Sequence, residues 1–243
     1  MRKAVFLDFD GVLFDTVKEA YYIAMLASGK AESADDIDFN SEHYAKFRKY
    51  RFLITKAPDY YYLLKAIDKR NGMPGIYSAL LGTDKAGEEK FKRKYFARRK
   101  SFKTKNRDFW LSLNTPYVFF HRIRYIVGRK PEVFFIITTK DKDTVIDLLK
   151  IQGIRFFKRN IFDLSAGDVF RSKREAILFV CGKYRVKRSL YIDDSAYHLA
   201  QASGIPGMDI LQAGWGYAGG SKNTAGESEA LARIEKFFGG KNV

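Results

Sequence analysis

The chain has 243 residues, of which 46% are hydrophobic and 16% aromatic; this excludes a disordered protein and allows one core domain with an inserted subdomain. Its formal net charge of +16 is large and raises the question of an anionic substrate or partner, whereas no apolar run approaches the length of a membrane span. The lone Cys181 excludes an internal disulfide, and the start of the chain predicts no signal peptide, so we expect a cytoplasmic protein without a membrane partner.

The first predicted element is a buried strand, Val5–Leu7, which runs into two aspartates and a glycine. Asp8 and Asp10 are one residue apart, so on an extended backbone they point to the same side. Carboxylates this close repel each other unless one is protonated or a hard divalent cation such as Mg²⁺ lies between them. An Asp-rich turn after an edge strand is the alternative interpretation of this pair alone.

A block of helices is expected after Thr16. Apolar residues recur at three- and four-residue steps from Val17 onward, with a polar loop at Ala31–Asn40. Between Val17 and Trp110 there are 21 Lys and Arg residues against 12 Asp and Glu residues, more than half of the excess positive charge. The sequence therefore predicts a basic, helical inserted subdomain over residues 17–113.

The segment Lys90–Arg107 contains ten basic residues and no acidic one. Phe91, Tyr95 and Phe102 are expected near one face of the same helix, and Phe96 is interleaved with them. Such a run is typical of surfaces that bind nucleic acid, acidic membranes or anionic substrates, and it is also typical of an ordinary solvated helix face.

Strands and helices alternate beyond residue 113, which predicts a Rossmann-like α/β fold: a mainly parallel sheet with helices on both faces, plus the inserted α-helical cap. The expected strands after the first are Glu132–Ile137, Ile154–Phe157, Ser189–Asp194 and Met208–Leu211. The expected helices are Pro116–Val127, one through Val145 to Ile151, Lys173–Cys181 with Ser172 as its cap, Ala196–Ser203 and Leu231–Phe238.

Polar residues follow these strands at the edge where Asp8 is expected. Thr138 and Thr139 end one strand, and Thr138 suits either an anion ligand or the cap of the next helix. Asp193 and Asp194 end another strand, where helix-capping acids are the alternative interpretation. With a lysine, such groups supply the nucleophile, proton carrier, cation ligands and hydrogen-bond donors that phosphoryl transfer needs.

The segment Asp8–Thr16 resembles the first motif of the haloacid dehalogenase-like hydrolase superfamily, in the form found in its phosphatases. Thr138-Thr139-Lys140 resembles the second motif, Lys173 matches the third with Lys158 as a rival, and Asp193-Asp194 resembles the fourth. The stretches Ala200–Ile205 and Gly214–Tyr217 are similar to the helix and the loop that follow the fourth motif in phosphoglycolate-phosphatase-like members of this superfamily.

This resemblance implies a catalytic core of residues 1–16 and 114–243 and a helical cap of residues 17–113. It implies Asp8 as the nucleophile that forms an aspartyl-phosphate and Asp10 as the general acid and base. It further implies a phosphate site made by Gly11, Thr138, Thr139 and Lys173, and Mg²⁺ held by Asp8, the main-chain carbonyl of Asp10, and Asp193 or Asp194.

The chain departs from the family at Tyr197 and His198, where many relatives carry another acid, and we expect His198 to be a partly exposed helix residue. The favoured function is hydrolysis of a small phosphorylated metabolite, because Asp10 has no role in dehalogenation. A mutase or a phosphonate hydrolase with a cap lysine remains open. The alternatives from other classes are a nucleic-acid end phosphatase that uses the Lys90–Arg107 run and a catalytically retired binding protein.

Overall fold

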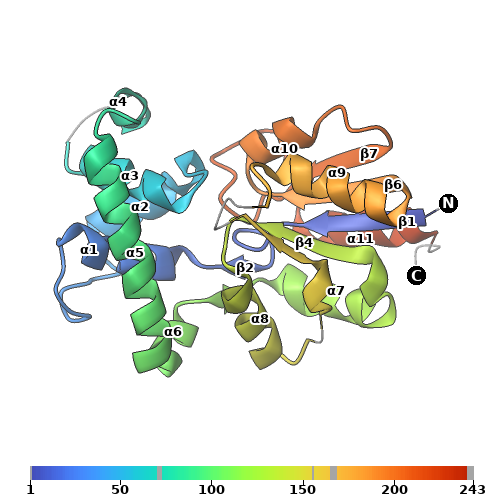
Figure 1. Ribbon diagram of the computed structural model, residues 1–243, viewed down its shortest axis with the longest axis horizontal. Coiled ribbons are helices and arrows are strands. Elements are labelled where there is room, and N and C mark those ends of the chain that lie inside the picture. Colours follow the sequence, from blue (N-terminus) through green and yellow to red (C-terminus); the bar gives the residue numbers. More distant parts are fainter. Residues whose placement is uncertain (1, 70–72, 155, 165–168, 240–243) are drawn as a thin grey trace. The chain divides into compact units, whose positions relative to one another are not determined.

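The computed structural model describes residues 2–69, 73–154, 156–164 and 169–239 of the chain. The chain forms two compact units, Met1–Asp15 with Pro116–Val243, and Thr16–Thr115 (Figure 1). It passes between them near two short strands, β2 (Phe14–Asp15) and β3 (Thr115–Pro116). Within the described ranges, no helix is long and apolar enough to cross a bilayer.

The first unit is built on a parallel sheet of five strands in the order β5-β4-β1-β6-β7. Leu7 at the end of β1 pairs with Ile136 of β4 and Ile192 of β6, so the carboxyl ends of these three central strands meet at one edge of the sheet. The strands are β1 (Arg2–Leu7), β4 (Phe134–Thr138), β5 (Ile161–Asp163), β6 (Val186–Asp193) and β7 (Met208–Gln212).

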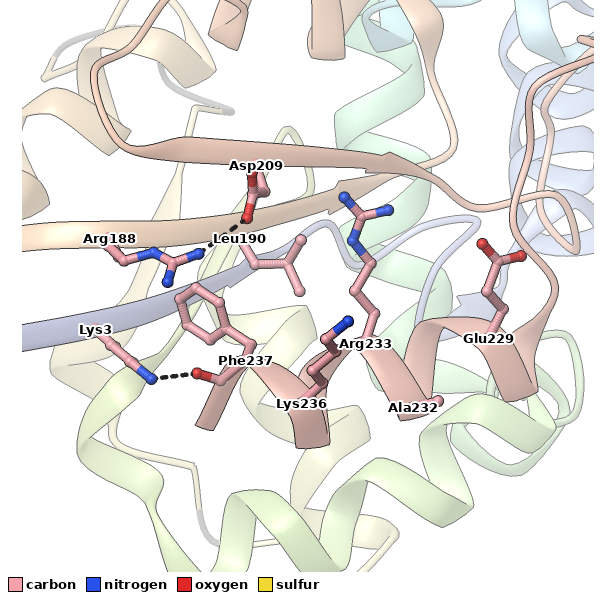
Figure 2. A pocket seen from close by; sticks show the side chains of 9 residues that line it. All are labelled: Lys3, Arg188, Leu190, Asp209, Glu229, Ala232, Arg233, Lys236 and Phe237. Atoms are coloured by element: carbon pink, nitrogen blue, oxygen red, sulfur yellow. Dashed lines mark hydrogen bonds and ion pairs between the residues drawn. The ribbon is translucent and has the colours of Figure 1, made fainter. Parts of the chain in front are cut away.

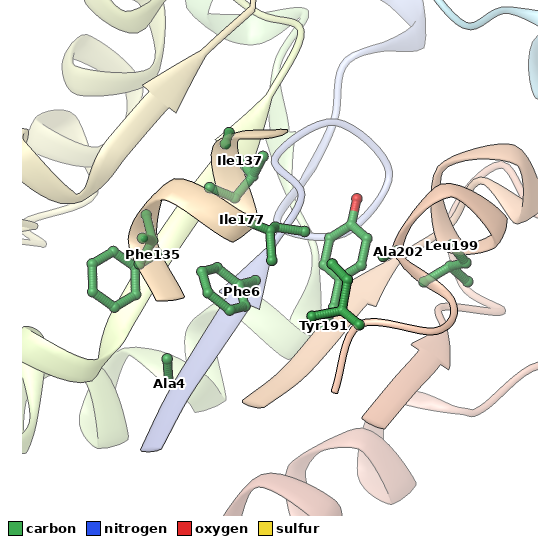
Figure 3. Packing of buried hydrophobic residues seen from close by; sticks show 11 residues of the cluster. Ala4, Phe6, Phe135, Ile137, Ile177, Tyr191, Leu199 and Ala202 are labelled. Atoms are coloured by element: carbon green, nitrogen blue, oxygen red, sulfur yellow. The ribbon is translucent and has the colours of Figure 1, made fainter. Parts of the chain in front are cut away.

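Helices cover both faces of this sheet, because alternate strand residues point to opposite sides. One face packs against α9 (Lys173–Tyr184) and α10 (Ala196–Ala202), where Phe6, Phe135 and Tyr191 join Ile177 and Leu199 in a buried cluster (Figure 3). On the other face lie α7 (Val118–Arg129) and α11 (Glu227–Phe238), and α8 (Lys142–Ile151) follows β4 (Figure 1). The predicted α/β class is confirmed.

The strand predicted at Ile154–Phe157 is wrong. Gly153 has a φ of 73°, and the Ile154 N–H donates to the Leu149 carbonyl at 3.0 Å, so this donor closes α8 instead of joining a sheet. Ile154, Phe156 and Phe157 lie in no strand, and Arg155 lies outside the described residues. The third strand of the chain's α/β part is instead β5, whose Ile161 pairs with Ile136.

The start of one predicted helix and the start of one predicted strand also differ from those in the structure. Pro116 does not begin α7, because Tyr117 has an extended backbone with a ψ of 160° and donates its N–H to the Leu13 carbonyl at 3.0 Å. The strand expected to start at Glu132 is preceded by a 3₁₀ turn, Pro131–Val133, and reaches Thr138. Ser172 caps α9 as predicted, accepting the N–H of Glu175 at 3.2 Å.

The second unit is helical, as the spacing of its apolar residues predicts. Its core contains the buried side chains of Phe47, Tyr62, Tyr95 and Trp110. The elements are α1 (Val17–Ser28), α2 (Glu42–Lys49), two 3₁₀ turns (Arg51–Leu53 and Ala57–Asp59), α3 (Tyr60–Ile67), α4 (Met73–Leu80), α5 (Lys85–Lys105) and α6 (Arg107–Ser112).

The basic segment forms most of α5, the longest described helix. Phe91, Tyr95 and Phe102 lie in the core of the second unit, which confirms that they share a face, and most of the basic side chains are exposed. Among these basic residues Arg99 is the buried one: its guanidinium makes two hydrogen bonds, of 2.6 and 2.7 Å, to the Glu19 carboxylate.

Candidate active site

Asp8 lies directly after β1, and its own N–H continues the sheet by donating to the Ile192 carbonyl at 3.0 Å. One carboxylate oxygen, Oδ1, accepts the N–H of Phe9 at 2.7 Å. The other, Oδ2, lies 2.8 Å from Nζ of Lys173, the first residue of α9. Both side chains are buried, so the fold places one carboxylate and one ammonium together at the carboxyl edge of the sheet.

Asp193, the last residue of β6, shares the same ammonium, since its Oδ2 is 2.8 Å from Lys173 Nζ. The Tyr191 hydroxyl donates to that oxygen, and the Ser195 N–H donates to Oδ1 at 2.8 Å. His198 Nδ1 lies 3.5 Å from Asp193 Oδ2. The expectation of a partly exposed His198 is wrong: it is 8% exposed, because α10 begins immediately after β6 and turns this residue toward Asp193.

The electrostatics of this cluster follow from its burial. Burial raises the pKa of Asp8 well above its usual range, with Lys173 opposing the shift and Asp193 and Asp194 adding to it. Burial disfavours the charged form of Lys173, but the two carboxylates outweigh it and raise its pKa. For Asp193, burial is outweighed by Lys173 and His198, which lower its pKa. The shared ammonium therefore favours the ionised form of Asp193, whereas burial and the neighbouring carboxylates disfavour the ionised form of Asp8.

Asp10 lies at the same edge, where its Oδ1 is 3.2 Å from Nζ of Lys140. Lys140 is buried, and its N–H donates to Thr138 Oγ1 at 3.1 Å. Thr138 is not the cap of α8, because Asp141 accepts the Thr144 N–H in that position. Thr139 follows Thr138 and is half-buried. Residue type alone predicted no role for Lys140, although its place directly after the strand-terminal threonines puts it at this edge.

Gly11 is positioned by a close approach to Asp194. It has a φ of 83°, and a Cβ atom at this position would overlap the Asp194 carboxylate. Asp194 Oδ2 accepts the N–H of Tyr217 at 2.7 Å. A Cβ atom at Gly216 would in turn overlap the Gly11 carbonyl, so the loop after β7 closes over the loop after β1. In the sequence, Gly216 and Tyr217 belong to the loop that resembles phosphoglycolate-phosphatase-like proteins, and no contact with Gly11 or Asp194 was predicted for them.

Lys158, the rival of Lys173, is exposed in the 3₁₀ turn Lys158–Asn160. The structure thus brings Asp8, Lys173 and Asp193 into direct contact, pairs Asp10 with Lys140, and sets Gly11 against Asp194. Thr138 and Thr139 end the neighbouring strand β4.

The donor set fits a hard divalent cation. The edge carries the carboxylates of Asp8, Asp10, Asp193 and Asp194 against the ammonium groups of Lys140 and Lys173, an excess of negative charge in a largely buried place. Ligand atoms of Asp8, Asp193 and His198 also lie within 4.8 Å of one another. Lys173 Nζ lies 2.8 Å from both Asp8 Oδ2 and Asp193 Oδ2, so these two carboxylates share one positive charge.

Solved structures with the same fold cover nearly the whole chain. A haloacid dehalogenase-like family hydrolase from Streptococcus pneumoniae is 15% identical, with a TM-score of 0.60 over 96% of this chain and 98% of that one. A predicted phosphatase from Clostridium acetobutylicum is 14% identical, with a TM-score of 0.60 over 98% of both chains. A predicted phosphoglycolate phosphatase from Haemophilus somnus is 12% identical, with a TM-score of 0.61 over 96% of this chain and 98% of that one.

No protein-family model matches the sequence, and no curated protein matches it either. At 12–15% identity, the solved structures establish a shared fold. The resemblance noted in the sequence is therefore confirmed at the level of the fold: the chain folds as haloacid dehalogenase-like proteins do, over both of its units.

Proposed function

We propose that the protein is a Mg²⁺-dependent haloacid dehalogenase-like phosphatase that hydrolyses a small phosphorylated metabolite. The observation that carries this proposal is the contact of 2.8 Å between Asp8 and Lys173 at the carboxyl edge of the sheet. A nucleophile that attacks a phosphate dianion needs neighbouring positive charge, and Lys173 supplies it without blocking Asp8 Oδ1. The shared fold with hydrolases and phosphatases supports the same reaction class.

In the proposed reaction, a carboxylate oxygen of Asp8 attacks phosphorus, and the bond from phosphorus to the ester oxygen breaks. Asp10 donates a proton to the leaving oxygen, which departs as an alcohol. Ionised Asp10 then takes a proton from water, whose oxygen attacks the aspartyl-phosphate and releases inorganic phosphate. Asp8 is regenerated, and Asp10 again carries its proton.

The phosphate oxygens are assigned to donors at the same edge. Thr138 offers its hydroxyl and Lys173 its ammonium, and Gly11 is assigned to the same site by its place in the loop that follows Asp8 and Asp10. Thr139 lies beside Thr138 at the end of β4 and is assigned to the same site. Lys140 acts through Asp10, which it holds at 3.2 Å.

We assign the Mg²⁺ site to Asp8, the main-chain carbonyl of Asp10, and Asp194. Asp193 is the less suitable direct ligand, because Lys173, Tyr191 and Ser195 already engage its carboxylate oxygens. When bound, Mg²⁺ supplies positive charge that screens the phosphate from the attacking carboxylate. In this assignment, Asp193 fixes Lys173.

The division of labour between the units is also a proposal. Residues 1–16 and 114–243 would form the catalytic core, and residues 17–113 would form a helical cap that selects the substrate. The net positive charge of residues 17–110 suits a phosphorylated, anionic substrate. A cytoplasmic location remains the expectation from the single cysteine.

The test is release of inorganic phosphate from a panel of phosphorylated metabolites, with and without Mg²⁺. We expect Mg²⁺-dependent turnover that falls about 10³-fold or more in Asp8→Asn. Asp35→Asn is the matched control, because Asp35 is exposed in the loop Ala31–Asn40. No turnover from a folded protein with any compound would favour a binding protein on a retired hydrolase fold.

A nucleic-acid end phosphatase keeps one supporting observation, the exposed basic face of α5. The aromatic residues of the same helix do not support this alternative, because Phe91, Tyr95 and Phe102 are buried and cannot stack on bases. If this alternative holds, binding of a short single strand weakens steeply between low and moderate salt. Binding that changes little with salt would exclude it.

A further inference from the structure

A groove of about 550 Å³ lies between α11 and strands β6 and β7, on the face of the sheet opposite α9 and α10 (Figure 2). Alternation along the strands explains which side chains reach it: Lys3 belongs to β1, and Arg188 and Leu190 belong to β6. From α11 come Arg233, Lys236 and Phe237. Four of these six side chains are cationic.

The groove is separate from the proposed catalytic edge. Lys3 and Arg188 lie near the starts of the two strands that lead to Asp8 and Asp193, five residues earlier in each case. At about 3.3 Å per residue, this separation is roughly 16 Å along each strand. A ligand in this groove therefore leaves Asp8 accessible.

The cations of the groove are only partly neutralised. Arg188 Nη2 lies 3.7 Å from Asp209 Oδ2, and Lys3 Nζ donates to the Phe237 carbonyl at 2.5 Å. Arg233 and Lys236 are exposed and three residues apart, so they share a face of α11. In the part of the chain that the structure describes, neither makes an ion pair, and both project toward the space beside the strands (Figure 2).

The floor of the groove is apolar, and its rim carries two acids. Leu190 and Phe237 form the floor, and Lys3 Nζ lies 5.4 Å from the centroid of the Phe237 ring. Asp209 and Glu229 offer acceptors for hydroxyl or amino groups. The volume falls within the roughly 300–1,000 Å³ of small-molecule sites.

We propose that this groove binds a small organic polyphosphate of the size of a nucleoside triphosphate. The phosphate groups pair with Arg188, Arg233 and Lys236, whose planar or multiple donors suit phosphate oxygens. The organic part covers Leu190 and Phe237, and the acids at the rim accept its hydroxyl or amino hydrogens. Neither the proposed hydrolysis nor its residues are needed for this binding.

The first test is calorimetric titration of the full chain in metal-free buffer at low salt with ATP, inorganic tripolyphosphate and adenosine. We expect saturable binding of ATP, weaker binding of tripolyphosphate and none of adenosine. The double variant Arg233→Gln/Lys236→Gln should weaken ATP binding at least tenfold. The control Lys150→Gln/Lys158→Gln removes the same charge from exposed positions elsewhere and should change binding less than twofold.

The second test locates the ligand. Photolabelling with 8-azidoadenosine triphosphate, followed by mass spectrometry, should modify peptides that contain α11 or the strand segments at Arg188 and Asp209. Absence of saturable ATP binding would overturn the proposal, as would equal weakening by the two double variants. Labelling confined to the loop after Asp8 or to α5 would also overturn it.

Discussion

Lys173 Nζ lies 2.8 Å from Asp8 Oδ2, and the two side chains are only 1% and 8% exposed. Asp8 follows the first strand, and Lys173 begins a helix more than 160 residues later, so only the folded sheet brings them together. A buried ammonium is tolerated here because two carboxylates surround it. The pair is thus both a structural element of the core and the basis of the proposed chemistry.

Replacing Lys173 should therefore destabilise the protein as well as inactivate it. Lys173→Met leaves Asp8 and Asp193 buried without their shared cation, and we expect a loss of about 3–5 kcal/mol in the free energy of unfolding in urea. Lys158→Met is the control, since exposed Lys158 should contribute no more than about 0.5 kcal/mol. Equal effects of the two substitutions would contradict the assignment of Lys173.

Gly11→Ala should lower the free energy of unfolding by more than the replacement of a glycine in the left-handed region normally does. Its φ of 83° strains any other residue, and the new methyl group also displaces the Asp194 carboxylate. Gly29 is a matched control, with a φ of 76° and no atom within 4 Å of an added Cβ. Gly29→Ala should lower the free energy of unfolding by about 1–2 kcal/mol, and Gly11→Ala should lower it by clearly more. Similar unfolding free energies for both variants would show that the approach to Asp194 is unimportant.

The buried ion pair of the second unit gives a test that is independent of the catalytic proposal. Arg99→Met leaves Glu19, which is 0% exposed, without its bidentate partner, and should destabilise the protein by about 3–5 kcal/mol. The exposed neighbour Arg98→Met should change stability by no more than about 0.5 kcal/mol. Adding Glu19→Gln to Arg99→Met should recover part of the loss, and its failure to do so would contradict this account.

The lowered pKa of Asp84 predicts how acid affects the stability of the second unit. Tyr61, the Gly87 N–H and Lys65 lower the pKa of Asp84 to about 2, so its ionised form stabilises the folded state. The unfolded value is about 3.9, so this stabilisation is complete above roughly pH 5 and declines as the pH falls toward 2. Asp84→Asn retains a capping side chain but lacks this charge. The stability difference between the two proteins should shrink between pH 6 and pH 3 in denaturant titrations; a constant difference would be inconsistent with the lowered pKa.

The sequence predicted the elements that its local patterns encode. Apolar strands that end in acids or threonines identified β1, β4 and β6, and because all parallel strands end at one edge, the polar cluster followed. The strand predicted at Ile154–Phe157 was wrong because an apolar residue after a helix-ending glycine is equally typical of a helix cap, in which Ile154 takes part.

The partners of each site residue were less predictable. With 44 Lys and Arg residues in the chain, residue type alone does not separate Lys173 from Lys158, and only the start of α9 next to Asp8 does so. Burial of His198 depends on how α10 turns after β6. The approach of Gly216 to Gly11 is a contact between loops more than 200 residues apart, which no local pattern encodes.

The central claim is that Asp8 carries the phosphoryl group, and acid-quench trapping tests it most directly. The protein is mixed with ³²P-labelled acetyl phosphate and Mg²⁺, quenched in acid and digested, and the labelled peptide is identified. We expect one hydroxylamine-sensitive label on the peptide that contains Asp8, absent in Asp8→Asn and present in the control Asp35→Asn. A label on another residue, or one that persists in Asp8→Asn, would contradict the proposed nucleophile.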